Sequence, residues 1–430
     1  TACGPQCTRC GTPTNGTARC VAGVCTASCN TDRFNAVAGA CVPCGGAEQP
    51  VCVAGAPCSP GYTNMAGTCR DCPGNVVGTS NLVDSTCAVM GDGSVRCWGR
   101  NLYGQLGNNT MTNSVQPVVV HGVSSAVEIE GGHYHQCVRL ANGAVQCWGY
   151  NSYGNLGDGT TNARAVPVQV HGITAGATSI AGGLYHACAV VAGAVRCWGH
   201  NADGQLGDLT MTDRRTPVVA FLLTSDVVQV VAGGYHTCAL FNTGSVRCWG
   251  RNSEGQLGNG STSSSSTPVT PSGLTSGVVR LSAGMYHTCA VLTSGAMRCW
   301  GHNSNGQLGT GTNTTRLTPT AVSGISTATD TVCGYYHTCA RLSDGTVRCW
   351  GRNDSGQLGD ATTTQRLTPV GVIGLSGVTS MSAYYYNTCA VLSDGTARCW
   401  GYNNYSQVGD GTTTLRNVPT PVANLGSGGC

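Results

Sequence analysis

The sequence predicts an all-β fold: a seven-bladed β-propeller preceded by a small disulfide-rich, loop-dominated domain. The chain has 430 residues, and its seven tryptophans recur at intervals of 50 or 51 residues. Each interval contains short apolar runs separated by Gly-rich turns, the pattern of a four-stranded blade. Twelve of the 28 cysteines precede the first repeat. We therefore expect a cysteine-rich, disulfide-stapled head over 1–73 and the propeller over 74–430.

The composition restricts the function classes. The 28 cysteines are too many for a reducing compartment, so we expect disulfides and a secreted protein, extracellular or on the cell surface. All 22 basic residues are Arg, they form no run, and the formal net charge is +3. This excludes nucleic acid as a partner, because phosphate binding needs clustered positive charge. No apolar stretch is long enough for a membrane span.

The head lacks the apolar periodicity of a hydrophobic core, so disulfides must substitute for one. Six disulfides are expected, with a connectivity that the sequence does not define. Zinc at its C-x-x-C pairs is the alternative. The head cysteines are Cys3, Cys7, Cys10, Cys20, Cys25, Cys29, Cys41, Cys44, Cys52, Cys58, Cys69 and Cys72.

The repeats begin near residue 73, and the fourth illustrates their strands. An apolar run over 227–231 is followed by strand-like runs over 236–240 and 245–249. A Pro-flanked apolar run, such as Pro117 to Val120 in the first repeat, completes a blade. No helical periodicity occurs, so we expect four short strands in each repeat.

Two motifs of the repeat identify a family. The pattern W-G-x-N-x-x-G-Q-L-G recurs, as over 249–258, and a stretch such as 281–288 precedes each cysteine pair. These motifs resemble the regulator-of-chromosome-condensation repeat family, which implies a seven-bladed propeller. The family's nuclear founders are exchange factors for a small GTPase, but this chain has cysteines in every blade and no basic tail. It is more similar to secreted bacterial relatives, among them a β-lactamase inhibitor that binds its target across one propeller face. The stretch from Cys58 to Cys69 resembles epidermal-growth-factor-like modules.

Each repeat contains two cysteines, nine or ten residues apart, on either side of a predicted hairpin turn. A three-residue turn ending in Gly places both cysteines opposite each other, within reach of a disulfide. The third repeat shortens both its turn and its cysteine spacing by one residue, which keeps that register. We therefore predict intra-blade disulfides Cys87–Cys97, Cys137–Cys147, Cys188–Cys197, Cys238–Cys248, Cys289–Cys299, Cys339–Cys349 and Cys389–Cys399.

A histidine recurs two residues before the first cysteine of five repeats: His135, His186, His236, His287 and His337. A ring of histidines could bind metal or protons, but a structural hydrogen bond to a neighbouring strand is the preferred interpretation. Asp-Gly turns at 158 and 410 lack the alternating acidic ligands of calcium loops. No catalytic motif is present, so we expect no enzyme activity, no cofactor site and no metal site.

Two cysteines remain, Cys333 and Cys430, and they are candidates for a closing or an inter-subunit disulfide. An inter-subunit bridge would join copies head-to-tail into a polymer. Glycans are the other modification expected of a secreted chain with N-x-[ST] sites. The candidate sites are Asn15, Asn108, Asn259, Asn313, Asn353 and Asn404.

Two functions fit these features. The first is a non-enzymatic extracellular structural scaffold that self-assembles head-to-tail into a surface filament or matrix. The alternative is a secreted binding module, inhibitor-like or adhesin-like, that grips a protein or glycan on one propeller face. An aromatic patch would favour binding. The candidates, confined to repeats one, two and seven, are Tyr103, Tyr150, Tyr153, Tyr402 and Tyr405.

Overall fold

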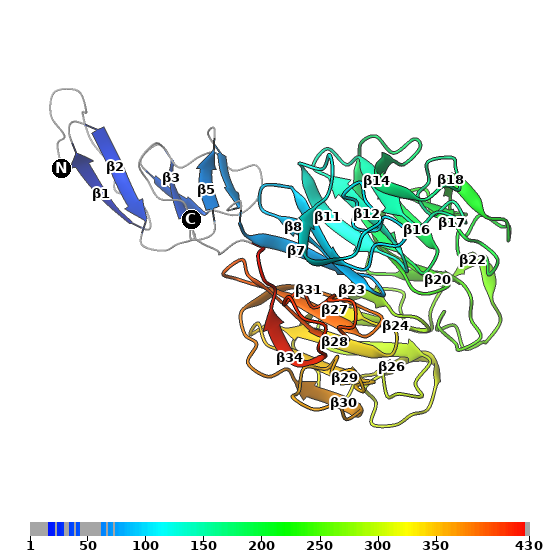
Figure 1. Ribbon diagram of the computed structural model, residues 1–430. Coiled ribbons are helices and arrows are strands. Elements are labelled where there is room, and N and C mark those ends of the chain that lie inside the picture. Colours follow the sequence, from blue (N-terminus) through cyan, green and yellow to red (C-terminus); the bar gives the residue numbers. More distant parts are fainter. Residues whose placement is uncertain are drawn as a thin grey trace. The chain divides into compact units, whose positions relative to one another are not determined.

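The fold is shown by a computed structural model (Figure 1), which describes residues 74–425 and, before them, the backbone of short strands. The predicted head disulfides, Asn15 and Cys430 lie outside the described residues. The early strands form three antiparallel hairpins: β1 (Gly16–Val21) with β2 (Val24–Cys29), β3 (Phe34–Val37) with β4 (Ala40–Pro43), and β5 (Tyr62–Met65) with β6 (Thr68–Asp71).

The larger of two compact units comprises Val76–Val89 and Gly93–Leu425. It is a seven-bladed β-propeller, which confirms the propeller part of the predicted fold class. Among the described residues, no helix has the length and apolar character needed to cross a membrane. Blades 1 to 3 consist of β7 (Val76–Asn81), β8 (Ser85–Met90), β9 (Val95–Gly99) and β10 (Ser114–Val119); β11 (Ala126–Gly131), β12 (His135–Leu140), β13 (Val145–Gly149) and β14 (Arg164–Gln169); β15 (Ala177–Gly182), β16 (His186–Val191), β17 (Ala194–Gly199) and β18 (Arg214–Val219).

The remaining blades repeat this order. Blades 4 and 5 consist of β19 (Val227–Ala232), β20 (His236–Phe241), β21 (Val246–Gly250) and β22 (Ser265–Val269); β23 (Val278–Ala283), β24 (His287–Leu292), β25 (Met297–Gly301) and β26 (Arg316–Ala321). Blades 6 and 7 consist of β27 (Ala328–Cys333), β28 (His337–Leu342), β29 (Val347–Gly351) and β30 (Arg366–Gly371); β31 (Val378–Tyr384), β32 (Asn387–Leu392), β33 (Ala397–Gly401) and β34 (Arg416–Pro421). In every blade the strands pair in chain order, so each sheet is an antiparallel meander.

The hairpin between the second and third strands follows the predicted turn chemistry. In blade 2 the register pairs Cys137 with Cys147, and Gly143 in the turn has a φ of 79°. In blade 3 the shortened turn places Ala192 and Gly193 at φ values of 51° and 78°, as a two-residue turn with two left-handed positions requires. All seven predicted pairs form disulfides in the structure, with Cα atoms 4.0–4.1 Å apart.

The hydrophobic cores lie between blades rather than within them. One cluster joins the Cys87–Cys97 disulfide and Leu106 of blade 1 to Ile129 and Trp148 of blade 2, all buried. Equivalent clusters combine the disulfide of one blade with the tryptophan of the next along the ring. A blade therefore cannot bury its own disulfide alone, and the repeats depend on their neighbours.

The Q-L-G motif receives the tryptophan of the following blade. Trp148 Nε1 donates a hydrogen bond to the carbonyl oxygen of Gln105 at 2.9 Å. Gly107 has a φ of 65°, and a Cβ atom there would lie 2.8 Å from Trp148 Nε1. Both conditions require glycine. Trp98 makes the same bond to Gln407 of blade 7 at 3.0 Å, which closes the ring.

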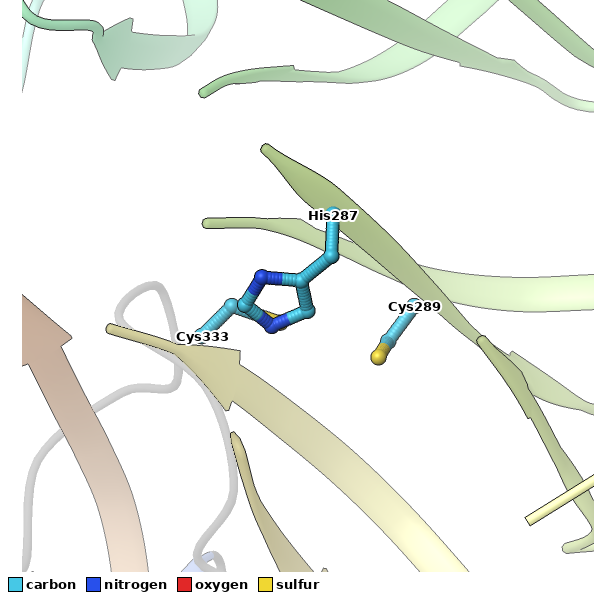
Figure 2. A group of neighbouring side chains, drawn as sticks. All are labelled: His287, Cys289 and Cys333. Carbon is cyan, nitrogen blue, oxygen red and sulfur yellow. The ribbon is translucent and has the colours of Figure 1, made fainter. Parts of the chain in front are cut away.

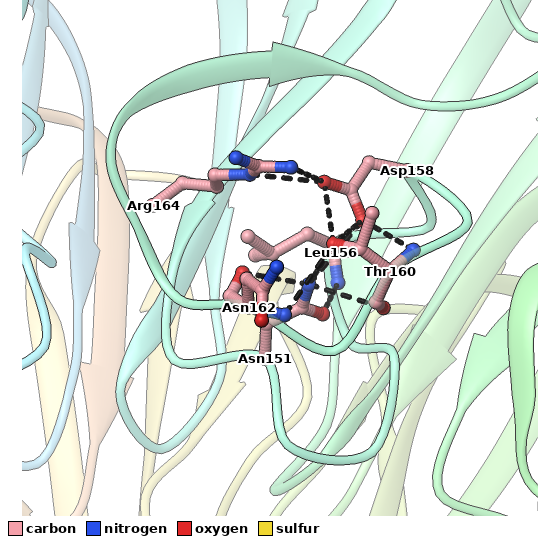
Figure 3. A network of polar contacts seen from close by, with 6 residues as sticks. All are labelled: Asn151, Leu156, Asp158, Thr160, Asn162 and Arg164. Atoms are coloured by element: carbon pink, nitrogen blue, oxygen red, sulfur yellow. Dashed lines mark hydrogen bonds and ion pairs between the residues drawn. The ribbon is translucent and has the colours of Figure 1, made fainter.

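The asparagine of W-G-x-N organises the loop that leads to the outer strand (Figure 3). In blade 2, Asn151 Nδ2 donates to the carbonyl oxygens of Thr160 at 3.2 Å and Asn162 at 3.0 Å, and its Oδ1 accepts from the Leu156 amide at 2.9 Å. Asp158, in the Asp-Gly turn of this loop, forms a 3.0 Å ion pair with Arg164. These contacts give the loop a fixed shape.

Candidate interaction face

The strongest candidate site is a ring of tyrosines on one face of the propeller. A tyrosine directly precedes the recurrent histidine, or its replacement Asn387, in six blades, at the start of the second strand. Each of these side chains is partly exposed. They are Tyr134, Tyr185, Tyr235, Tyr286, Tyr336 and Tyr386.

A second row of side chains follows the tryptophan-glycine pair at the end of each third strand. It consists of aromatic and cationic residues, all partly exposed: Arg100, Tyr150, His200, Arg251, His302, Arg352 and Tyr402. We name the two rows together with Tyr103, Tyr153, Tyr335, Tyr385 and Tyr405 the tyrosine face.

Ring contacts run through all blades of this face. Across blades 1 to 3, the Tyr103 ring centroid lies 5.1 Å from that of Tyr150, and the Tyr153 centroid lies 5.2 Å from that of Tyr185. The circuit continues from His200 to Tyr235 at 6.3 Å, from Tyr235 to Tyr286 at 6.4 Å and from Tyr286 to His302 at 6.3 Å. It then passes from His302 to Tyr336 at 5.8 Å, from Tyr336 to Tyr335 at 6.1 Å and from Tyr335 to Tyr385 at 4.8 Å.

Arg100 of blade 1 contacts a tyrosine of each neighbouring blade. Its guanidinium carbon lies 4.9 Å from the ring centroid of Tyr405 and 6.0 Å from that of Tyr134. It also forms a 2.8 Å ion pair with Asp84, the residue that replaces the ring tyrosine in blade 1. These cation–π contacts link Tyr405 of blade 7 to Tyr134 of blade 2 through Arg100.

The structure brings the predicted tyrosines together and enlarges the patch. Tyr103, Tyr150 and Tyr153 contact one another in sequence, and Tyr402 lies 6.3 Å from Tyr385 by ring centroid. The patch is not confined to repeats one, two and seven, because the tyrosine before each histidine extends it through the other blades. Aligning the repeats on the histidine would have revealed these residues.

Two tyrosines of this face, Tyr185 and Tyr386, have hydroxyl groups that stay neutral near neutral pH. Burial raises the pKa of Tyr185 and of Tyr386 to about 12. The Tyr386 hydroxyl accepts a 2.7 Å hydrogen bond from Arg352, whose guanidinium also pairs with Asp354. The face therefore offers flat apolar rings with hydroxyl groups that donate and accept hydrogen bonds.

The recurrent histidines have a structural role. His186, His236, His287 and His337 are fully buried, and each places Nε2 2.8–2.9 Å from a threonine hydroxyl of the next blade. That threonine donates its own proton to a glutamine carbonyl, as Thr237 does to Gln205 at 2.8 Å. The histidine must therefore carry its proton on Nε2. Burial lowers the pKa of His236 to about 3, which keeps the ring neutral.

The innermost strands line a central cavity of about 460 Å³. Most of the polar side chains that line it form hydrogen bonds or ion pairs with the surrounding strands. Glu128 accepts from the Ile180 amide at 3.4 Å and forms a 2.6 Å ion pair with Arg139. Glu130 is exposed to the cavity, and its protein surroundings and the charges of Glu128 and Asp330 raise its pKa to about 8. These carboxylates were not among the predicted site residues.

The glycosylation candidates fall into different environments. Asn313 and Asn404 are exposed, and Asn108 and Asn259 are partly exposed. Asn353 is fully buried, and its Nδ2 donates to Asp360 Oδ1 at 3.0 Å. The prediction at Asn353 is therefore wrong, because it is the loop-organising asparagine of blade 6 and its amide nitrogen is not accessible.

The candidate role of Cys333 in an inter-subunit disulfide is also contradicted. Cys333 ends the innermost strand of blade 6, its thiol is free, and the residue is 4% exposed. A bridge to a second chain requires a sulfur that reaches the surface. Burial prevents this at Cys333.

Comparisons with known proteins agree with this architecture. A model of the RCC1-like domain matches residues 164–429, and a model of the regulator of chromosome condensation (RCC1) repeat matches residues 92–138. The human E3 ubiquitin-protein ligase HERC2 is 37% identical over 87 residues, as is its mouse counterpart. That segment is 20% of this chain and 2% of the ligase, so the chain spans a very small part of this relative.

Solved structures share the fold. Human WBSCR16 superposes with a TM-score of 0.67 at 20% identity, covering 77% of this chain and 94% of that one. Yeast RCC1 (Prp20), solved bound to Kap60, gives a TM-score of 0.66 at 18% identity and covers 81% and 85%. A second structure of Prp20p from Saccharomyces cerevisiae, described with its binding properties to Gsp1p and histones, gives 0.66 at 20% identity and covers 82% and 88%. From the match over more than half of its length, this chain belongs to the RCC1-like domain family.

Proposed function

We propose that this chain is a non-enzymatic extracellular interaction module that binds a partner protein through its tyrosine face. The observation that carries the proposal is the row of ring contacts that runs from Tyr103 to Tyr402 around the blades, with Arg100 stacked between Tyr134 and Tyr405. Tyr and Arg are enriched at the energetic centres of protein interfaces, because they combine a large contact area with hydrogen bonds. The yeast relative solved bound to Kap60 supports binding of proteins by an RCC1-like propeller.

Two further features support the extracellular, non-enzymatic part of the proposal. Seven disulfides within one propeller are typical of an oxidising compartment. The recurrent histidines, which would be the natural proton-transfer groups, are buried, and burial lowers their pKa and keeps the rings neutral. They do not reach the tyrosine face, so the surface there is suited to binding rather than proton transfer.

The test is selective capture. The full chain is immobilised and exposed to the extracellular proteins of its source, and so is a variant with Tyr185→Ala, Tyr235→Ala and Tyr286→Ala. Loss of one hot-spot tyrosine costs about 2 kcal/mol, or about 30-fold in affinity, so the triple variant should retain none of the partner. A control variant, Thr216→Ala, Thr318→Ala and Thr368→Ala, alters outer strands and should retain it. Retention of the partner by the variant without the three tyrosines, together with its loss from the threonine variant, would refute the proposal.

The scaffold function stays as the second candidate because blade 3 exposes an apolar edge. Leu209, Met211 and Leu222 are 55%, 56% and 76% exposed. Two of them sit where the other blades mostly have glycine, and they adopt left-handed backbone with φ values of 67° and 58°. Exposed leucines on strained backbone mark a surface suited to contact with another chain, here a second copy.

A further inference from the structure

The free thiol of Cys333 lies near the side chains of Cys289 and His287 at the junction of blades 5 and 6 (Figure 2). Cys289, Cys333 and a ring nitrogen of His287 lie within 4.8 Å of one another, and all three residues are buried. Cys289 is already bonded to Cys299. It cannot act as a thiolate ligand in that state, so only two of the three groups remain for a metal ion. The same proximity instead places a nucleophilic thiol next to a disulfide sulfur.

The register shows that the fold directs Cys333 toward that disulfide. Within blade 6, Cys339 pairs with Val332, so the adjacent Cys333 points to the opposite face of the sheet. That face packs against blade 5, as the buried cluster containing Cys289, Cys299 and Cys333 shows. The hydroxyl of Thr338 lies 4.0 Å from both Cys289 Sγ and Cys333 Sγ, which places both sulfurs around one group.

The equivalent position in blade 1 independently shows that a side chain there reaches the disulfide of the preceding blade. Asn81 lies six residues before Cys87, as Cys333 lies six residues before Cys339. The Asn81 side chain donates a 3.3 Å hydrogen bond to Cys389 Sγ of the neighbouring blade. A side chain at this repeat position therefore reaches the first disulfide cysteine of the preceding blade. In the remaining blades the position has Gly or Ala, which lacks a reactive group: Gly131, Gly182, Ala232, Ala283 and Ala383.

We propose that Cys333 exchanges with the Cys289–Cys299 disulfide to form an alternative Cys289–Cys333 disulfide that covalently links blades 5 and 6. The Cys333 thiolate attacks Cys289 Sγ, the Cys289–Cys299 bond breaks, and Cys299 leaves as a thiolate that takes up the proton. One disulfide and one thiol exist before and after the step, so no external oxidant or reductant is needed. Burial raises the pKa of the Cys333 thiol to about 12, which makes the exchange slow at neutral pH.

The first test follows the thiol at the junction of blades 5 and 6 in the wild-type chain. Protein incubated at pH 7, 8 and 9 is quenched with acid, denatured in the presence of a maleimide, and mapped by mass spectrometry without reduction. The label should be on Cys333 at first and should then appear on Cys299, about tenfold faster per pH unit, because the rate follows the thiolate population. A label that stays on Cys333 at every pH and time would overturn the proposal.

The second test uses a matched pair of variants in a glutathione disulfide buffer. Cys299→Ser leaves Cys289 without its partner, and we expect peptide mapping to find the Cys289–Cys333 disulfide. Cys349→Ser leaves Cys339 in the same situation in blade 6, but the facing position in blade 7 is Ala383. Its Cys339 should remain a free thiol. Free thiols at both Cys289 and Cys333 in the folded Cys299→Ser variant would contradict the exchange.

Discussion

His186 of blade 3 places its Nε2 2.9 Å from the Thr237 hydroxyl of blade 4. Four such bonds join consecutive blades, from blade 3 to blade 7. His135 of blade 2 has the same position and is equally buried, but Ala187 stands where its threonine would be. Both ring nitrogens of His135 lack a hydrogen-bond partner. The histidine–threonine hydrogen bond that joins the later blades is therefore missing between blades 2 and 3.

We predict that Ala187→Thr stabilises the propeller. The new hydroxyl would accept from His135 Nε2, and a satisfied buried hydrogen bond contributes about 1 kcal/mol. The melting temperature or the free energy of unfolding in denaturant measures the gain. Ala187→Val is the matched control, since it has the shape of threonine without the hydroxyl group. Equal stabilisation by both variants would show that packing, and not the hydrogen bond, is responsible.

We predict that the propeller loses stability as the pH falls from about 6.5 toward 3. Burial lowers the pKa of His135, His186, His236 and His337 to about 3, whereas an unfolded histidine titrates near 6.5. The unfolded state then binds more protons, so the free energy of unfolding decreases by up to about 1.4 kcal/mol per pH unit for each histidine. Glu130, whose pKa is raised to about 8, opposes this loss of stability in the upper part of the range, because its folded form takes up a proton there.

Thermal unfolding between pH 3.5 and 7.5 measures this dependence. The variant His236→Asn introduces the residue that blade 7 has at the same position, and it should show a shallower loss of stability on acidification. A melting temperature that is constant over this range would contradict the account of the buried histidines.

We predict that Asn353 carries no glycan and that Asn353→Ala destabilises blade 6. Its Nδ2 binds Asp360 and the carbonyl oxygens of Thr362 and Thr364, and its Oδ1 accepts from the Leu358 amide at 3.0 Å. Removing a buried amide with these partners costs about 1–3 kcal/mol. Asn313→Ala, at an exposed site, should leave the free energy of unfolding unchanged. A glycan found at Asn353 by mass spectrometry would contradict the assigned loop structure.

We predict that Leu222→Gly reduces self-association and preserves the fold. The leucine is 76% exposed at a φ of 58°, and most other blades have glycine there, as at Gly122 and Gly172. Glycine adopts this backbone without strain, so the variant should be at least as stable as the wild type. Light scattering at increasing concentration measures association. Unchanged assembly in the variant would exclude this edge as the contact between copies.

The fold could be predicted because its signals are local and repeated. Gly143 at the end of a hairpin turn fixes the register that pairs Cys137 with Cys147. The same relation between turn length and cysteine spacing applies in every blade. The turn at Ala192 and Gly193 was predictable for the same reason, since one deleted residue is compensated by the cysteine spacing. Such features depend on neighbours in the chain.

Contacts between blades could not be predicted in this way. The proximity of Cys333 to Cys289 depends on how two sheets pack, and the burial of Asn353 depends on the fold of its loop. The tyrosine that precedes the histidine, such as Tyr235, was visible as a repeated letter. Its orientation toward one face follows only from the positions of the strand ends around the ring.

The central claim is that the tyrosine face binds a partner protein, and the dissociation constant of that partner tests it most directly. The partner retained by the full chain is purified and titrated against the wild type, Tyr235→Ala and Thr318→Ala. The account predicts about 30-fold weaker binding for Tyr235→Ala, because a hot-spot tyrosine contributes about 2 kcal/mol, and no change for Thr318→Ala on an outer strand. Equal affinity for the wild type and Tyr235→Ala, with weaker binding by Thr318→Ala, would contradict it.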